Sequence, residues 1–287
     1  MHDIIYSVQT IYKLERVRSG FKRRTILIRE LVRTDFKLRY SESILGYMWS
    51  ILKPLAMFTI LYFVFAKVFR VGDVVPHYAV YLLMGVMLWN YFSEVTSSGV
   101  TAIIEKGDLM RKIDFDKNTI MISKSASALI NLGLYSAVLA LFIIIFGADV
   151  QLWLLPLVPL LLVELIVFAY SISKLLATVY VRFRDMSYIW DVALQALFYA
   201  TPLLYPISFV VDNFSLLAAK ILLLNPVAQI TQDLRTILVT NDKVSLGSVY
   251  GEHEWWARLF SIMLVVVTWA IAALYFNKHK KRFAEYV

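Results

Sequence analysis

The chain has 287 residues, of which 60% are hydrophobic and only 17% are charged. A soluble domain carries about 25% charged residues, and its surface must stay wetted. The surplus of apolar side chains therefore excludes a single soluble domain and indicates a protein embedded in lipid. The sequence contains no cysteine, which excludes disulfides and thiolate chemistry. Its four histidines lie far apart in the sequence, so we expect no metal site.

Six stretches of the sequence are long and apolar enough to cross a bilayer as a helix, which takes about 20 residues. They cover residues 47–69, 77–98, 120–146, 151–173, 188–210 and 257–276. The sequence therefore predicts an all-α, polytopic membrane protein with a six-span transmembrane domain over residues 47–276.

The net charge of +8 is unevenly distributed between the segments that join the predicted spans. Segments 1–46, 105–124, 174–184 and 278–282 hold 10, 5, 3 and 4 of the 29 Lys and Arg residues. Because cytoplasmic loops carry an excess of Lys and Arg, we place all four segments in the cytoplasm. Both termini of the multi-pass protein are then cytoplasmic. The charge is explained by this topology, and no nucleic-acid partner is expected.

Residues 1–46 form a polar and basic segment before the first predicted span. Within it, residues 4–15 predict an amphipathic helix, because its apolar residues share one helical face. This helix would lie in the membrane interface or, as the alternative, pack on a partner in the cytoplasm. No cleavable signal peptide is expected, because the first long apolar run begins only near Tyr47. Residues 277–287 are predicted to form a basic cytoplasmic tail.

The region 199–239 combines prolines with apolar segments that are too short to span a bilayer. Pro202 and Pro206 interrupt the fifth predicted span, and Asn225-Pro226 precedes a further helix. The apolar face of that helix is formed by Val227, Ile230, Leu234, Ile237 and Leu238. Two half-length segments around a turn are typical of a re-entrant hairpin, which requires burial in protein. An external pair of helices is the alternative.

Two features of the predicted spans are candidates for lining a channel. Glu164 lies near the middle of the fourth span, where a charge is costly and usually functional. It contributes either to a translocation path or subunit contact, or to a structural hydrogen bond with a neighbouring helix. Four aromatic residues share one face of the first span: Phe58, Tyr62, Phe65 and Phe69. Sugars stack on such faces, but aromatic residues are also common in helix contacts and at membrane interfaces. Tyr199 and Tyr205 complete the candidate channel-lining set.

No motif in the sequence supports catalysis by this chain. It lacks a G-x-x-x-x-G-K-[ST] phosphate loop, so it does not run an ATP cycle by itself. Residues 105–118 contain the only acidic cluster, formed by Asp108, Asp114 and Asp116. Basic neighbours in the same segment indicate a docking surface rather than a metal site. We therefore expect no catalytic residue, no metal and no cofactor in this chain.

Four segments of the sequence resemble type-2 ABC exporter permeases, in the branch that exports O-antigen, teichoic acid and similar glycans. They are LRYSESILGYMWSILKPLAMFTILYFVF (38–65), GVMLWNYFSEVTSSGVTAIIEKGDLMRKIDF (85–115), VRFRDMSYIWDVALQALFYATPLLYPIS (181–208) and LNPVAQITQDLRTILV (224–239). The resemblance covers most of the chain in the right order. It implies a homodimer with two copies of a separate ATPase subunit, and a path between the two permeases for a lipid-linked glycan.

The resemblance also implies roles for particular residues. By position, residues 105–115 match the cytoplasmic helix that docks on the ATPase, with Glu105, Lys106, Asp108, Leu109, Arg111 and Lys112 as coupling residues. A second contact is matched by Arg182, Arg184 and Asp185. The region 199–239 matches the external gate. A short charged segment transmits a push if it is helical and docked, so that ATP-driven closure of the partner shifts an inward/outward equilibrium.

The function that follows is that of a permease subunit that moves a lipid-linked polysaccharide across the cytoplasmic membrane. One alternative is a type-2 ABC permease for another cargo, such as a drug or a lipid; the aromatic face of the first span favours a glycan. The other is a membrane-embedded enzyme acting on a polyprenyl lipid. That enzyme would need an acidic cluster or metal site at the interface, and metal-dependent turnover by the purified chain would reveal it.

Overall fold

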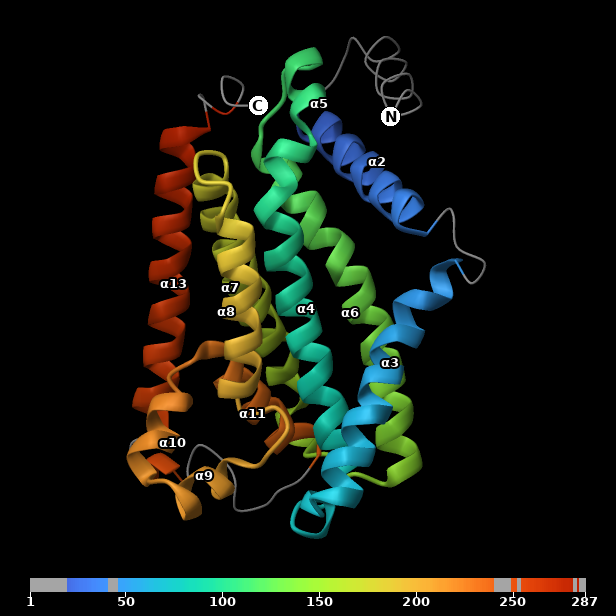
Figure 1. Ribbon diagram of the computed structural model, residues 1–287, viewed down its shortest axis with the longest axis vertical. Coiled ribbons are helices and arrows are strands. Elements are labelled where there is room, and N and C mark those ends of the chain that lie inside the picture. The colour runs from blue at the N-terminus through green and yellow to red at the C-terminus, as the bar shows by residue number, and fades with distance from the viewer. Residues whose placement is uncertain (1–19, 41–45, 240–248, 252–253, 281–282, 284–287) are drawn as a thin grey trace.

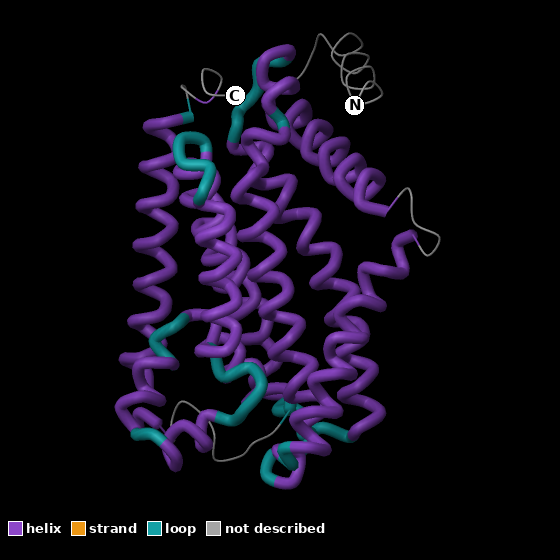
Figure 2. Tube along the Cα trace, viewed as in Figure 1, coloured by secondary structure: helices purple, strands orange, loops and turns teal. Residues whose placement is uncertain are grey.

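The computed structural model describes residues 20–40, 46–239, 249–251, 254–280 and 283. The predicted amphipathic helix at residues 4–15 lies outside the described residues. Throughout the described ranges the chain forms helices and loops without a strand (Figure 2). The predicted all-α class is therefore confirmed.

Eleven α-helices are defined within the described residues. They are α2 (Gly20–Tyr40), α3 (Trp49–Tyr62), α4 (Tyr78–Glu105), α5 (Gly107–Lys112), α6 (Asn118–Phe146), α7 (Val158–Tyr180), α8 (Met186–Ala200), α9 (Ile207–Asn213), α10 (Leu216–Leu222), α11 (Pro226–Leu238) and α13 (Glu254–His279). Shorter helical segments are η1 (Gly46–Met48), the π-helical η2 (Phe63–Val68), η3 (Val71–Asp73) and η4 (Leu152–Leu157).

The long helices run along the long axis of the molecule and give it two ends (Figure 1). The α5 end, at the top of the view, contains α5, the loop 181–185 between α7 and α8, and the last turn of α13. The α9 end, at the bottom, contains η3, α9, α10 and the first turn of α13. The predicted cytoplasmic loops therefore gather at the α5 end.

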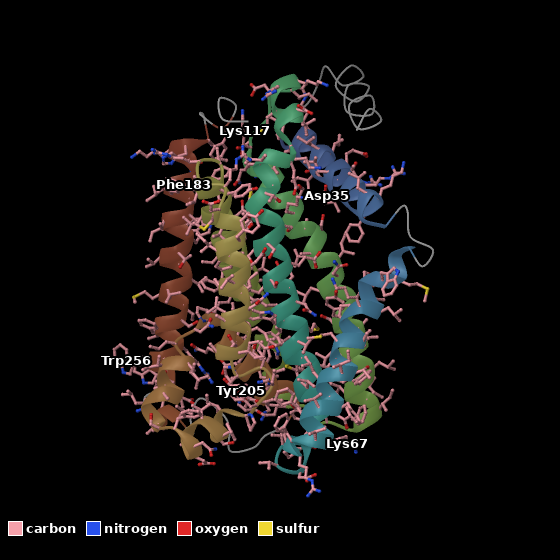
Figure 3. The ribbon with its side chains drawn as sticks, in the orientation of Figure 1. Asp35, Lys67, Lys117, Phe183, Tyr205 and Trp256 are labelled. Atoms are coloured by element: carbon pink, nitrogen blue, oxygen red, sulfur yellow. The ribbon has the colours of Figure 1, made fainter. Side chains whose placement is uncertain are left out.

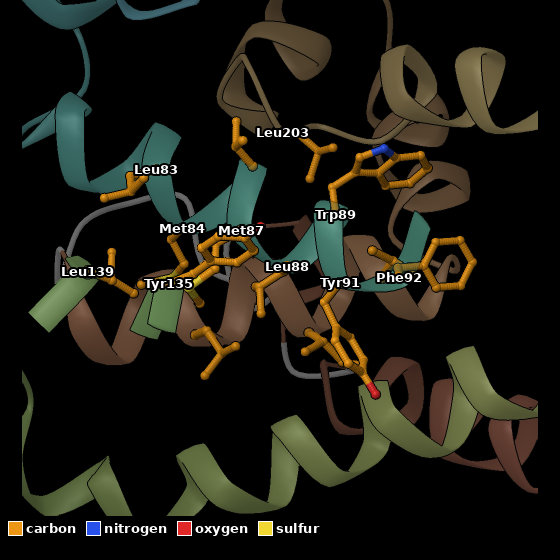
Figure 4. Packing of buried hydrophobic residues seen from close by; sticks show 14 of the residues in the cluster. Leu83, Met84, Met87, Leu88, Trp89, Tyr91, Phe92, Tyr135, Leu139 and Leu203 are labelled. Carbon is orange, nitrogen blue, oxygen red and sulfur yellow. The ribbon is translucent and has the colours of Figure 1, made fainter. Parts of the chain in front are cut away.

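The central helix of the molecule is α4, which packs against α3, α6, α7, α8 and α11. Twenty of its 28 residues are buried, including every residue from Tyr78 to Trp89. A helix that is apolar around its whole circumference is expected in the interior, and this stretch has that composition. Figure 4 shows the packing, in which Tyr135 and Leu139 of α6 and Leu203 from the chain after α8 meet α4. The core of the molecule is built around this helix.

Four segments in the described part of the chain are long and apolar enough to cross a membrane. They are Trp49–Val68, Asn118–Phe146, Leu152–Tyr180 and Glu254–His279. These correspond to the first, third, fourth and sixth predicted spans. The second predicted span lies in α4, which has the length, but its second half is polar. The fifth is α8 with only 15 residues, because Thr201 leaves the helical conformation just before Pro202. The structure supports a multi-pass protein, and six spans stay a prediction.

Helix α2 was not predicted, because its composition is polar and charged. Its residues Leu27 and Leu31 are 7% and 1% exposed and lie one helical turn apart. This spacing of four is the sequence signal that would have revealed the buried face of the helix. Through this face and its neighbours, α2 packs against α6 and α5.

Candidate functional site

The predicted coupling segment contains the short helix α5. Asp108, Arg111 and Lys112 are exposed on α5, whereas Leu109 is only 7% exposed. Leu109 packs in one apolar cluster with Leu27 and Leu31 of α2. The helix thus presents charged side chains to the surface, while an apolar side chain fixes it to α2. Figure 1 shows α5 at the end of the molecule.

Ion pairs make a second connection between α2 and the segment around α5. The Lys106 ammonium lies 2.9 Å from Asp35 Oδ1, and the Lys124 ammonium of α6 lies 3.2 Å from Asp35 Oδ2. Lys124 also lies 3.1 Å from Glu105 Oε2. The Asp35, Lys106 and Lys124 side chains are only 9–12% exposed. Removing Asp35 would leave the nearly buried Lys106 ammonium without its carboxylate, at a cost of about 3 kcal/mol or more. The network joins α2, α4 and α6 just beneath α5.

Glu105 and Lys106 were predicted from the sequence as coupling residues, but Asp35 and Lys124 were not. Asp35 lies 71 residues before Lys106 in the chain, and their pairing follows only from the way α2 packs. Figure 3 labels Asp35 on α2, to the side of the α5 end.

The predicted second contact lies at the same end of the molecule. Arg182, Arg184 and Asp185 are all exposed in the loop between α7 and α8. The Arg184 guanidinium lies 5.5 Å from the centre of the Tyr180 ring, so it stays close to the end of α7. Figure 3 shows that Phe183 of this loop and Lys117 both lie at the α5 end. The structure therefore places both predicted coupling groups on one end.

Two carboxylates of the acidic cluster in residues 105–118 pair with different lysines. Asp114 lies 3.7 Å from the Lys117 ammonium, and Asp116 lies 3.9 Å from that of Lys280. Such exposed pairs contribute about 1 kcal/mol or less to stability. Within the described ranges, no three His, Asp or Glu side chains are arranged to hold a metal ion.

At the α9 end, the chain after α8 turns back under α4. The Tyr78 hydroxyl donates a 2.6 Å hydrogen bond to the carbonyl of Leu204, and that of Tyr205 donates a 3.0 Å bond to the carbonyl of Tyr199. Tyr199 is 68% exposed, and Tyr205 is half-buried. The two predicted channel-lining tyrosines are therefore adjacent, and only Tyr199 lies fully at the surface.

The predicted helix after Asn225-Pro226 is confirmed as α11. The Asn225 side chain accepts a 3.0 Å hydrogen bond from the Val227 amide and caps the helix, and Pro226 occupies its first turn. Val227, Ile230, Leu234 and Ile237 of the predicted apolar face are 1–4% exposed. The helix packs against α4, α7 and α13, so its polar residues are buried as well.

The most deeply buried charge among the described residues is Arg235 of α11, which is 1% exposed. Its guanidinium donates hydrogen bonds to the carbonyls of Pro202, at 2.7 Å, and Leu203, at 2.6 Å. Two further bonds of 3.2 Å reach the carbonyl of Tyr81, and the guanidinium carbon lies 3.4 Å from the centre of the Tyr81 ring. Arg235 therefore ties α11 and the segment after α8 to the central helix.

A glycine on α4 makes room for this guanidinium. A Cβ at Gly85 would lie 2.6 Å from Arg235 Nη2 and 3.1 Å from the Leu203 carbonyl oxygen. Arg235 was not predicted from the sequence, because an arginine on the polar side of an amphipathic helix is expected in water. Its partners lie 32 to 154 residues away in the chain, and no local pattern indicates them.

The structure places Glu164 in contact with a neighbouring helix. Its Oε1 accepts a 2.9 Å hydrogen bond from the Ser261 hydroxyl of α13. One turn earlier on α13, Arg258 lies 3.2 Å from Asp233 of α11. Glu164 thus has a hydrogen-bond partner on a neighbouring helix, as the structural interpretation requires. Its role in a translocation path stays a prediction.

The aromatic face of the first span divides into two halves. Phe58 is 6% exposed, with its ring centre 5.8 Å from that of Tyr62 and 5.6 Å from that of Phe142 of α6. Phe65 lies within η2 and Phe69 at its end, and their ring centres are 5.5 Å apart. The Phe69 side chain is 66% exposed. The first half therefore contributes to packing within the chain, and Phe69 faces outward.

These features define a polytopic helical membrane protein with a charged helix docked at one end and a packed group of short helices at the other. The chain belongs to the ABC-2 type transporter family, whose model matches residues 26–239. The recognition of a type-2 ABC permease from the four sequence segments is thereby confirmed.

Curated relatives include three transport proteins. The chain is 29% identical over 251 residues to the O-antigen export system permease protein RfbA of Klebsiella pneumoniae, covering 88% of this chain and 91% of the relative. It is 26% identical over 269 residues to the protein of the same name from Myxococcus xanthus, covering 94% and 98%. It is 23% identical over 218 residues to the polysialic acid transport protein KpsM of Escherichia coli, covering 75% and 82%.

Proposed function

We propose that the chain is the membrane-spanning permease of an ATP-driven exporter that moves a lipid-linked polysaccharide out of a bacterial cell. The similarity to export permeases along nearly the whole chain carries this proposal. Two permease chains would form the path, and two copies of a separate ATPase subunit would supply the energy. The chain itself would perform no catalysis.

We propose that α4 and α8 complete a six-span domain with the four apolar helices. The segment with α9, α10 and α11 would form a re-entrant hairpin, and the burial of α11 against α4, α7 and α13 supports this arrangement. The excess of Lys and Arg at the α5 end supports a cytoplasmic location for that end.

The orientation is tested by labelling single cysteines, because the natural chain contains none. Asp108→Cys and Asp212→Cys introduce thiols at exposed positions of α5 and α9. With a membrane-impermeant maleimide we expect Asp212→Cys to react in intact spheroplasts. Asp108→Cys is expected to react only after the membrane is opened. Labelling of Asp108→Cys in intact spheroplasts would contradict the proposed orientation and place the α5 end outside the cell.

Coupling to the ATPase would occur through the exposed charges of α5. Because Leu109 and the Asp35 ion pairs fix the α5 segment to α2, a push on α5 would move α2 with it. The exposed loop with Arg182, Arg184 and Asp185 lies at the same end and would form the second contact.

Replacing the outward charges of α5 tests the coupling role. We expect Asp108→Ala and Arg111→Ala to lower export, and the ATPase activity that the permease stimulates, by about tenfold, as for important interface residues. Export is measured as surface polymer, and hydrolysis in membranes containing both subunits. The matched control is Asp73→Ala, which removes an exposed carboxylate near the other end. Wild-type export in both α5 variants would contradict the coupling role.

A further inference from the structure

A cavity of about 400 Å³ lies between η4, α7, α11 and α13, near the α9 end. Its volume falls within the range of about 300–1,000 Å³ that is typical of ligand sites. Apolar side chains such as Leu157, Leu161 and Val265 form most of its wall. Gln229, Asp233 and Arg258 form a polar part, and Glu164 and Thr236 add two further polar side chains to the lining. The cavity therefore suits a ligand with a long apolar portion and a small polar one.

The polar part contains a buried group without a partner. Gln229 is 3% exposed, and its Oε1 has no hydrogen-bond partner among the described residues. An unsatisfied buried acceptor is costly, so it requires a physical explanation. Asp233 is 8% exposed and pairs with Arg258, whose side chain remains 46% exposed. The Gln229 and Asp233 acceptors thus lie beside one accessible cation, and the Glu164 carboxylate lines the same cavity. This combination favours a ligand that carries both an ammonium and an anion.

Exposed tryptophans indicate the depth of the cavity in the membrane. Trp153 of η4, Trp255 and Trp256 are 78%, 55% and 59% exposed. Tryptophan is enriched at membrane–water interfaces, and Figure 3 shows Trp256 at the start of α13. Arg258 follows two residues later, about 3 Å along the helix axis. The polar part therefore lies at the level of the lipid headgroups, with the apolar wall at the level of the acyl chains.

We propose that this cavity binds a membrane phospholipid with a zwitterionic, amine-bearing headgroup. Its ammonium donates hydrogen bonds to Gln229 Oε1 and to the Asp233 carboxylate, while its phosphate lies beside the Arg258 guanidinium. One acyl chain follows the wall formed by Leu157 and its apolar neighbours. The site requires only that α7 and α13 lie in the membrane, so it is independent of the cargo and of the ATPase.

Native mass spectrometry of the purified full chain tests the site. The protein is titrated with phosphatidylethanolamine and, separately, with phosphatidylglycerol of the same acyl chains. We expect one phosphatidylethanolamine per chain, held about tenfold more tightly than phosphatidylglycerol, because only the first carries the ammonium. Asp233→Asn and Gln229→Leu should each reduce this preference.

Two further variants separate lipid binding from folding. Leu157→Trp places a bulky indole ring at a 41% exposed position of the wall. It should fill the cavity and weaken the binding of both lipids, with little change in the melting temperature. Asp212→Asn removes an exposed carboxylate of α9 and should bind lipid as the wild type does. Equal binding of the two lipids, unchanged binding by Leu157→Trp, or a second chain in place of the lipid would each overturn the proposal.

Discussion

Replacing Arg235 by leucine is expected to lower the free energy of unfolding by about 3 kcal/mol or more. The carbonyls of Pro202 and Leu203 would lose their guanidinium donors in a buried and non-helical segment, and each such loss costs about 1–3 kcal/mol. The contact with the Tyr81 ring would also disappear. Thermal unfolding of the detergent-solubilised variant measures the change, and export should fall with the amount of folded protein.

Two companion variants test the geometry behind this effect. Arg235→Lys keeps the charge, but an ammonium lacks the planar fork that reaches three carbonyls, so an intermediate loss is expected. Gly85→Ala keeps the arginine and adds a Cβ that the pinned guanidinium has little room to avoid. Arg70→Gln, at an exposed position near the α9 end, is the control. A wild-type melting temperature for Arg235→Leu would show that this buried charge does not hold the α9 end together.

A second large effect is expected at Gly99, where α4 and α7 cross closely. A Cβ at Gly99 would lie 2.9 Å from Ser173 Cβ, closer still to the Ser173 hydroxyl, and 3.4 Å from Met121 Cε. Rotation of the hydroxyl would not relieve the contact between the two Cβ atoms. Gly99→Ala should therefore cost about 1–3 kcal/mol, as is typical of overpacking, and Gly99→Leu more. The midpoint of thermal unfolding measures both.

The chain offers its own control for this substitution. Gly133 lies in α6, and a Cβ there would meet no atom within 4 Å. Gly133→Ala should be neutral or stabilise the protein by up to about 1 kcal/mol, because alanine favours helix. The double variant Gly99→Ala/Ser173→Gly removes the opposing Cβ and should recover most of the loss. If Gly99→Ala and Gly133→Ala behave alike, the close crossing of α4 and α7 is not a constraint.

Local patterns in the sequence were sufficient to predict most of the long helices. Apolar runs of span length indicated α3, α6, α7 and α13, and Asn225-Pro226 marked the start of α11. The prolines after α8 indicated an interruption, yet the fifth span was extended to residue 210 because its composition stays apolar. The structure ends the helix at Ala200, so backbone geometry outweighs composition here.

Contacts between distant segments could not be predicted in this way. Asp35 and Lys106 meet because α2 folds back along α6, and Arg235 is buried because three segments converge on it. Both arrangements depend on tertiary packing. A periodic pattern can mark the buried face of a helix, but it does not indicate which distant residue that helix meets. The outward charges of α5 were found because a dense charged stretch between two apolar runs is itself a local pattern.

The π-helical turn η2 interrupts the regular winding of the first apolar segment. The Phe69 amide donates a 3.0 Å hydrogen bond to the carbonyl of Val64, five residues earlier rather than four. Such a turn accommodates one additional residue, which rotates everything after it by about 100° around the helix axis. This offset accounts for the opposite surroundings of Phe58 and Phe69. Deleting a single residue between 63 and 68 would undo the rotation. The Phe69 ring would then face another direction, with no change in its chemistry.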